Sequence, residues 1–139
     1  MMIAVLDNNI LIDALEIREP FAEAAQQILR ESAQGKYICC FTSNSATDIY
    51  YVLNKRKGKE YAKAAITKLL NLLPVVSVTG QDCQQALDLP IDDFEDALLV
   101  VCAAKAQADC IITGDKDFLK AGSPVKVILP VDFLSEQSE

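Results

Sequence analysis

Apolar runs alternate with segments of helical periodicity along the chain, and this alternation predicts strands separated by helices. The first run, from Ile3 to Leu6, has four consecutive apolar residues and ends at Asp7. A short apolar run that stops at an acid is typical of a buried strand whose carboxyl end presents that acid. Similar runs predict four further strands at residues 37–41, 75–78, 110–113 and 125–129.

Helical patterns fill the intervals between these strands. In residues 21–33, Phe21, Ala24 and Ile28 recur on one face, which predicts that this face packs on the core. Residues 94–108 are apolar almost all round, so we expect that helix in the middle of the fold. Other helices are predicted at residues 9–17, 42–57, 60–73, 81–87 and 131–134.

Strands separated by helices throughout imply parallel pairing through right-handed crossovers. We therefore predict an α/β fold, a three-layer α/β/α sandwich with a central, mostly parallel sheet of four to five strands. The length of 139 residues suits a single domain, predicted at residues 1–135, followed by a mobile tail at residues 136–139.

Hydropathy argues against a membrane protein. The hydrophobic fraction is 51%, yet no apolar stretch reaches the ~18 residues that a membrane span needs. The N-terminus has no basic region and reaches an acid at Asp7, unlike a secretory signal peptide. We expect a cytoplasmic protein that does not bind membranes.

The chain has five cysteines and no histidine. The odd cysteine count, without a CxxC pair, and the apolar surroundings of most thiols predict packing residues in a reducing compartment. The absence of histidine excludes the usual zinc sites, Ser-His-Asp triads and Cys-His nucleophile pairs. Chemistry must then come from carboxylates, hydroxyls, amides and lysines.

The net charge of −7 argues against a protein that coats nucleic acid by bulk electrostatics. Nearly half of the 13 basic residues nevertheless gather at residues 55–68, which we call the basic segment, against the single acid Glu60. Its members are Lys55, Arg56, Lys57, Lys59, Lys63 and Lys68.

Several acids are expected at one edge of the predicted sheet. The carboxyl ends of parallel strands share an edge, so Asp7 after the first strand can meet Asp115 and Asp117 after the fourth. The helix at residues 94–108 could bring Asp96 to them, because this acid adjoins the apolar run and should face inward.

Helix capping is the competing explanation for the same acids. Asp7 or Asn8 could cap the following helix. Asp115 could close a turn, and Asp48 could lie on a solvated helix face. Two pairs also have the spacing of a capping box, Asp92 with Glu95 and Asp93 with Asp96.

A cluster of carboxylates has an electrostatic requirement. Carboxylates a few ångströms apart raise one another's pKa values, so such a cluster needs a cation or shared protons. Mg²⁺ or Mn²⁺ fits best, because hard cations take oxygen ligands. Such ions can polarise a phosphodiester and activate water without histidine. The acids therefore point to metal-assisted phosphodiester hydrolysis.

The chain resembles the PIN-domain family of small metal-dependent ribonucleases, which includes the VapC-type toxins of bacterial toxin–antitoxin pairs. Three stretches carry the resemblance: VLDNNILID, SNSATDIYYVL and DFEDALLVVCAAKAQADCIITGDKDF. Each is weakly specific alone, but their order and spacing are specific, and the resemblance spans residues 3–134.

The resemblance assigns roles to individual residues. Four acids match the family's catalytic acids, and Asp117 is an accessory acid in the last turn. Asn9 matches an amide that holds a carboxylate or water, and Thr113 a hydroxyl at the last strand's exit. Mg²⁺ or Mn²⁺ would bind Asp7, Asp96, Asp115 and Asp117. The four catalytic matches are Asp7, Asp48, Asp96 and Asp115.

Two positions depart from the family pattern. Position 8 is Asn where Thr or Ser is common, which changes a small hydroxyl contact near the metal or phosphate. Position 48 is Asp where Glu is usual, which shortens the arm by one methylene. Asp48 would then reach a metal only through water.

The resulting hypothesis is an endoribonuclease that cleaves single-stranded RNA, in the setting of a toxin with an antitoxin partner. Four residues of the basic segment are candidate RNA contacts, although the same helices could instead bind an antitoxin or a second subunit, and we expect a homodimer. One competing hypothesis is a catalytically inactive PIN-like domain that binds RNA or a protein. The other is a phosphoacceptor receiver-like domain that uses Asp7 or Asp48, which is disfavoured because this chain has no obvious lysine at a strand end. The candidate RNA contacts are Lys55, Arg56, Lys57 and Lys59.

Overall fold

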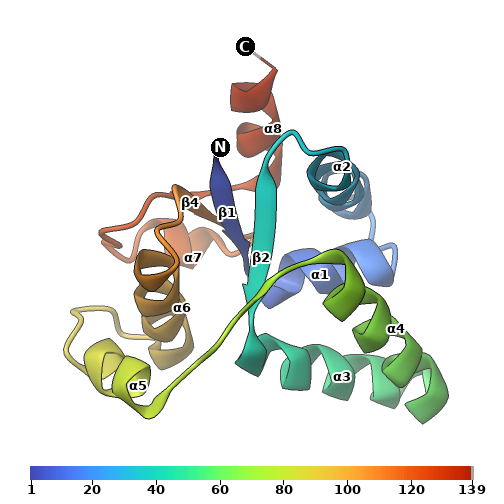
Figure 1. The fold of residues 1–139 in the computed structure, drawn as a ribbon, viewed down its shortest axis with the longest axis horizontal. Helices are drawn as coiled ribbons and strands as arrows, with labels where there is room; N and C mark the ends of the chain where they lie inside the picture. The colour runs from blue at the N-terminus through green and yellow to red at the C-terminus, as the bar shows by residue number, and fades with distance from the viewer. Residues whose placement is uncertain (139) are drawn as a thin grey trace.

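A computed structural model describes residues 1–138, and within them one five-stranded sheet forms the centre of the fold (Figure 1). The strand order is β3-β2-β1-β4-β5, and every neighbouring pair is parallel. The strands are β1 (Ile3–Leu6), β2 (Ile38–Thr42), β3 (Val75–Val76), β4 (Cys110–Ile112) and β5 (Val127–Ile128).

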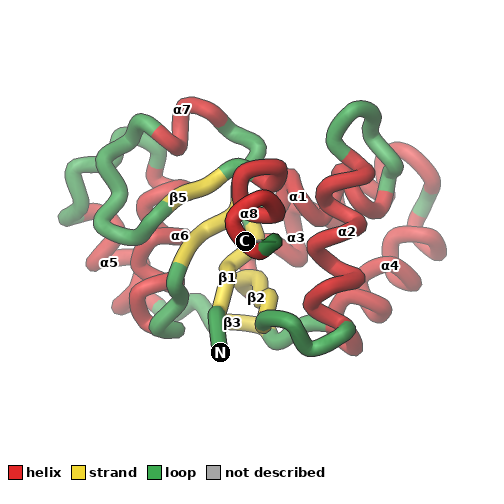
Figure 2. The backbone as a smooth tube through the Cα atoms, turned by 90° about the horizontal axis from the view of Figure 1, so that it is seen from above, coloured by secondary structure: helices red, strands yellow, loops and turns green. Residues whose placement is uncertain are grey.

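Helices cover both faces of this sheet. Seen from above, α1 to α4 lie on one side of the strands and α5 to α7 on the other, while α8 packs against α2 (Figure 2). The predicted α/β/α sandwich is therefore confirmed. The helices are α1 (Asn8–Leu15), α2 (Ala22–Ala33), α3 (Ser43–Lys57), α4 (Lys59–Leu72), α5 (Gly80–Leu87), α6 (Phe94–Lys105), α7 (Lys116–Leu119) and α8 (Pro130–Gln137).

Alternate residues along each strand supply two separate cores, because successive side chains point to opposite faces of a sheet. Ala4 and Leu6 of β1 belong to the core under α1 to α4 and α8. Val5, between them, belongs to the core that also contains Ile111 of β4 and the apolar side of α6. All three β1 side chains are fully buried, which explains the uninterrupted apolar run.

The cysteines pack as the sequence predicts. All five are free thiols, and four of them are buried. Burial raises the pKa of the Cys39 thiol to about 12, so it stays protonated and behaves as a small apolar side chain.

Within residues 1–138, no helix combines the length and the apolar character that a bilayer crossing requires.

Several predicted boundaries need correction. β3 and β5 are two residues each, shorter than the predicted 75–78 and 125–129. α6 ends at Lys105 rather than at residue 108, because Gln107 adopts a left-handed backbone with φ of 57°. The exit turn after β4 contains a short helix, α7, that no periodicity had indicated.

Two further corrections concern exposed segments. Phe21 was predicted on the core face of its helix, but it precedes α2 as the N-cap residue and its side chain is 59% exposed. Residues 136–137 were predicted to belong to a mobile tail, but they form the last turn of α8, where Glu136 pairs with Lys126 at 2.7 Å. Glu139 lies outside the described residues.

The strand order contains one reversal, at β1. From β1 the chain builds β2 and β3 on one side, and then crosses to the other side to add β4 and β5. Ligands of open α/β sheets gather at such a switch point, outside the carboxyl ends of the strands. In this chain that edge holds the residues that follow β1, β2 and β4.

Candidate active site

Asp7, directly after β1, is the most enclosed acid at the switch point. Its Oδ1 accepts a hydrogen bond from the Asn8 backbone N–H at 2.8 Å and so caps α1. Its Oδ2 accepts from Thr113 Oγ1 at 2.9 Å and from Asn9 Nδ2 at 3.2 Å. Burial raises the pKa of Asp7 despite these three donors, and the charge of Asp115 raises it further. Helix capping, the competing explanation, is therefore real, but it uses only one of the two oxygens.

Thr113 links the ends of β1 and β4. The residue is fully buried, and its Oγ1 accepts the Asp115 backbone N–H at 3.1 Å while donating to Asp7. Asn9 closes the arrangement, because its Oδ1 accepts the Gly114 backbone N–H at 3.0 Å. Asn9 and Thr113 thus hold the carboxylate of Asp7 and the turn that carries Asp115 in one hydrogen-bond network.

We expect Thr113→Val to destabilise the protein by about 1–3 kcal/mol, because the nearly isosteric side chain removes one of the two donors to Asp7 Oδ2 and leaves the Asp115 backbone N–H without its acceptor. Urea unfolding of the metal-free protein measures this effect. Thr113→Ser keeps the hydroxyl and should recover most of the lost stability. Equal stability of the valine variant and the wild type would show that the hydroxyl holds nothing in place.

Asp96 reaches the site from the first turn of α6. The neighbouring Asp93 caps that helix by accepting the Asp96 backbone N–H at 3.0 Å, which leaves the Asp96 carboxylate free to face the sheet edge. Burial, followed by the charges of Asp93, Asp7, Asp115 and Glu95, raises the pKa of Asp96 to about 7. The negative charges of Asp7 and Asp115 thus act on the Asp96 carboxyl group. The role of Asp96 as a site residue stays a prediction.

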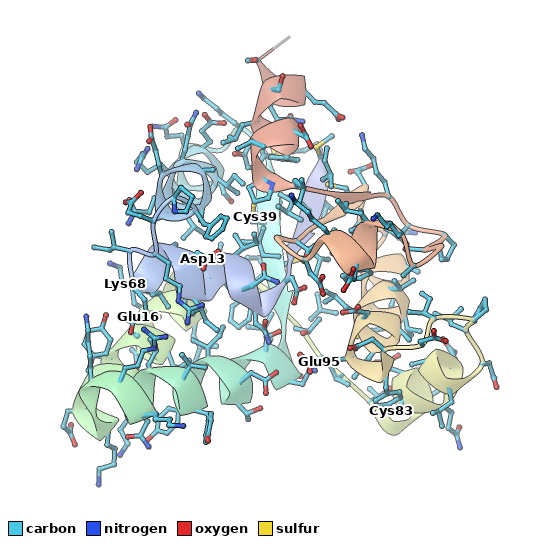
Figure 3. All side chains as sticks on the ribbon, turned by 180° about the vertical axis from the view of Figure 1, so that it is seen from behind. Asp13, Glu16, Cys39, Lys68, Cys83 and Glu95 are labelled. Atoms are coloured by element: carbon cyan, nitrogen blue, oxygen red, sulfur yellow. The ribbon has the colours of Figure 1, made fainter. Side chains whose placement is uncertain are left out.

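Glu95 is the acid that sequence reasoning missed as a site residue. It was paired with Asp92 as a capping box, but the structure has no such bond within residues 1–138, and Asp93 is the cap instead. Glu95 lies between α3 and α6 (Figure 3), and burial and the charge of Asp48 raise its pKa. The sequence did not indicate this role, because the four acids at residues 92–96 form two overlapping pairs with capping-box spacing and Glu95 was assigned to one of them.

Asn8 joins Glu95 to Asp48. Its Nδ2 donates to Asp48 Oδ2 at 3.1 Å and to Glu95 Oε1 at 3.3 Å, so the unusual amide at position 8 contacts the unusually short acid at position 48. Asp48 therefore faces the site rather than bulk solvent. Its prediction as a site residue gains this geometric support, through an amide that the family pattern does not contain.

A second group of acids lines a cavity of about 420 Å³ on the α7 side of the site. Asp96 and Asp115 belong to this cavity, and Asp117 lies beside them. Asp115 also caps α7, because its Oδ1 accepts the Asp117 backbone N–H at 2.9 Å. Lys120 is the only basic residue among those that line the cavity.

The donor set suits a hard divalent cation. Within residues 1–138 the four ion pairs involve other acids, and Lys120, which lines the neighbouring cavity, forms no ion pair with a site acid. A small pocket of about 10 Å³, room for one water-sized ligand, lies between Asp7 and Glu95. Asn44 lines it, and its buried Oδ1 has no hydrogen-bond partner in the described chain. A water ligand of a cation held by the neighbouring carboxylates would donate a hydrogen bond to this oxygen.

The acids do not yet form a closed coordination shell. Across residues 1–138, no three cysteine or acidic side chains lie close enough to share one ion. Cation binding would therefore require side-chain rotations that bring the carboxylates closer together. The attraction of each carboxylate to the cation would offset the repulsion among them.

The basic segment lies away from these acids. It spans the end of α3 and most of α4. Because α3 begins at the site and rises about 1.5 Å per residue, Lys55 is roughly 10 Å along the helix from Asp48. Lys57 pairs with Glu16 at 3.6 Å and lies over the Tyr61 ring at 4.8 Å. The predicted RNA contacts thus border the site rather than line it.

Comparisons with known proteins identify the family and agree with the fold. Residues 4–117 match the model of the PIN domain family. The chain is 27% identical over 118 residues to Ribonuclease VapC1 of Aquifex aeolicus, covering 81% of each protein. A chain of the VapBC2 structure from Rickettsia felis, bound to a promoter DNA fragment, is similar with a TM-score of 0.69 and 18% identity, covering 92% of this chain and 98% of that one.

A second similar structure is VapC20 of Mycobacterium tuberculosis, described as a toxin that cleaves the sarcin-ricin loop. Its TM-score is 0.69 at 19% identity, covering 86% of this chain and 95% of that one. The family match spans most of the chain, and the chain therefore belongs to the PIN domain family.

Proposed function

We propose that this member of the PIN domain family is a divalent-metal-dependent endoribonuclease that cleaves single-stranded RNA, and that it is the toxin of a toxin–antitoxin pair. The observation that supports the proposal is the position of Asp7 and Asp115, which follow adjacent parallel strands at one edge of the sheet, and of Asp96, which lines the same cavity as Asp115. Burial and neighbouring negative charges raise the pKa values of Asp7 and Asp96. Desolvated acids with no basic partner are costly unless the site binds a cation.

In this proposal Asp7, Asp96 and Asp115 hold Mg²⁺ or Mn²⁺, with Asp117 beside them and Asp48 acting through Asn8. When bound, the ion polarises the phosphodiester and makes a bound water a stronger nucleophile at neutral pH. Thr113 and Asn9 fix the Asp7 carboxylate, so its orientation is set before substrate arrives. Glu95 is a further candidate acid on the α3 side.

The toxin role is supported by family membership and by the names of the relatives: a ribonuclease VapC1, a VapBC2 complex and a toxin that cleaves the sarcin-ricin loop. An antitoxin protein is then the expected partner, and a homodimer the expected assembly. The acidic site would repel an RNA backbone, and exposed basic residues nearby would steer the RNA toward it. These residues are Lys55, Arg56, Lys57 and Lys59.

Metal titration tests the site directly. We expect Mn²⁺ or Mg²⁺ to raise the unfolding temperature of the wild type, because a ligand at about 100 times its Kd stabilises a fold by about 2.7 kcal/mol. Asp7→Asn should respond much less, while Asp88→Asn, an exposed acid on the remote C-cap of α5, should respond like the wild type. RNA cleavage measured in parallel should require the same ion.

The enzyme assignment would be contradicted if neither ion changed the unfolding temperature of the wild type and the protein did not cleave RNA. RNA or protein binding by that metal-insensitive protein would then favour the inactive PIN-like domain.

A further inference from the structure

A groove leads away from the acids, and it shares Asp115 with the α7 cavity. One part, of about 410 Å³, includes Asn9 and Asp115 of the site. The next part, of about 330 Å³, includes Pro130 and Val131 at the start of α8. The two parts share Asp13, Phe21 and Gly114, so they form one channel, which we call the α1–α8 groove. Its near end belongs to the candidate active site.

The far end of the α1–α8 groove is apolar and exposed. Phe21 is 59% exposed and Val131 is 63% exposed, although both belong to residue types that normally pack inside. Together with Pro130 they offer an aromatic face and an aliphatic wall. A flat heterocycle can stack on such a face, and base–aromatic stacking is a main source of affinity for unpaired nucleotides.

Asp13 is a buried acid on the same wall. The residue is only 8% exposed, and burial raises the pKa of its carboxyl group (α1 in Figure 3). Within the described chain its carboxylate accepts no hydrogen bond, and its one charged neighbour is Arg18, with Nη1 at 3.8 Å from Oδ1. A buried carboxylate whose acceptors are unfilled and open to a groove is suited to take donors from a ligand.

The chemistry of the carboxylate selects among the four bases. Two carboxylate oxygens accept and cannot donate, so the matching base edge carries two adjacent donors. Guanine presents N1–H beside its N2 amino group. Adenine and cytosine place a ring acceptor next to the amino group, and uracil flanks its N3–H with two carbonyl oxygens. Guanine is therefore the base that Asp13 fits.

Two cations are placed to hold the attached backbone. Arg18 lines the part of the groove next to Asp115, and Lys116 lines the apolar part. The loop before Arg18 is strained, because Ile17 is a β-branched residue with φ of 51°. The Arg18 backbone N–H donates to the Asp13 carbonyl at 3.0 Å, which helps to keep this conformation and places the guanidinium beside the groove.

We propose that the α1–α8 groove is a guanine-selective subsite for a nucleotide of single-stranded RNA close to the bond that is cut. Phe21 stacks on the base, Asp13 accepts from its N1–H and N2 amino groups, and Arg18 and Lys116 contact the flanking phosphates. The inference deepens the proposed ribonuclease function and rests on it for the identity of the ligand as RNA.

Binding without cleavage tests the subsite. Fluorescence anisotropy in EDTA at low salt compares labelled UUUGUUU, the same strand with inosine in place of guanosine, and a strand of seven uridines. The guanosine strand should bind about tenfold more tightly than the all-uridine strand. Inosine lacks the N2 amino group, so its strand should bind several-fold more weakly than the guanosine strand.

Variants separate the two contacts. Asp13→Asn should remove the difference between guanosine and inosine, and Phe21→Ala should weaken binding of the guanosine strand about tenfold. Asp88→Asn and Leu87→Ala, on exposed positions of the remote α5 region, are the matched controls and should change neither result. Unfolding curves identify any variant that fails to fold, and Phe21→Leu then serves as the milder replacement.

The outcomes distinguish this inference from the proposed function. Wild-type protein that binds the three strands equally, or binds none of them, overturns the guanine subsite. Guanine-selective binding by a protein that cleaves nothing with Mg²⁺ or Mn²⁺ removes the nuclease assignment and keeps the subsite. Metal-dependent cleavage of all three strands at equal rates keeps the nuclease and removes the subsite.

Discussion

Replacing Asp7 by asparagine should lower cleavage of single-stranded RNA by roughly 10²–10⁴-fold, the loss expected when several kcal/mol of transition-state stabilisation depend on one ligand of a metal site. Asparagine keeps the size of the side chain and can still accept the cap bond from the Asn8 backbone. It loses the charge that binds the cation and offers one acceptor oxygen where Thr113 and the cap use two. The measured quantity is the rate of cleavage at saturating Mn²⁺ or Mg²⁺.

The control for this result is again Asp88→Asn, which removes an equal charge from an exposed position. It should leave the rate within about twofold of the wild type, since Asp88 is exposed to solvent and lines none of the described pockets. Cleavage by purified Asp7→Asn at the wild-type rate would show that the metal, if it acts at all, binds elsewhere.

Replacing Asp96 by asparagine should change stability and activity in opposite directions. Burial and four neighbouring acids raise the pKa of Asp96 to about 7 in the folded protein, against about 3.9 in an unfolded chain. Between these values the folded state binds the extra proton, so the metal-free wild type should lose stability as the pH rises from about 4 to about 7. Asparagine has no proton to lose, and this loss should disappear.

The side chain of Asp96 is partly exposed, and solvent screening reduces the expected gain to on the order of 1–2 kcal/mol at pH 8. The gain should vanish near pH 4, where the acid is neutral in the folded wild type. Urea unfolding in EDTA at both pH values measures it, and RNA cleavage by the same variant should fall at least about 100-fold. A variant that is less stable than the wild type at pH 8 in EDTA would contradict the crowding of acids around this position.

The fold was predictable because the apolar pattern of this chain is explicit. The run from Ile3 to Leu6 is fully interpretable as a strand buried on both faces, and the helix at Ala97 to Ala103 is apolar because it lies against the sheet. Boundaries were less predictable where backbone conformation decides them. Nothing in the composition near Gln107 signals a left-handed residue, and α7 has one turn, too short to show a period.

The site was predictable only to the extent that topology decides it. Parallel strands bring Asp7 and Asp115 to one edge whatever their side chains do. The role of Glu95 depends on which of two adjacent acids caps α6, and that choice rests on helix phase rather than on spacing. Asp13 is a lone acid in an apolar helix, and no pattern marks it. Phe21 fits a helical pattern that wrongly predicted a core position for it. Only the packed structure shows that both residues line one groove.

The backbone pairing of β1 with β4 continues to the site itself, because the Asp7 N–H donates to the Ile112 carbonyl at 3.0 Å and Thr113 follows at once. The same ladder that holds the protein together therefore carries its reactive groups. A distortion that moved Asp7 away from Asp115 would also break backbone hydrogen bonds between β1 and β4, and would therefore destabilise the fold. If the proposed nuclease is regulated, we expect a bound protein to cover the opening of the site and to leave the sheet unchanged.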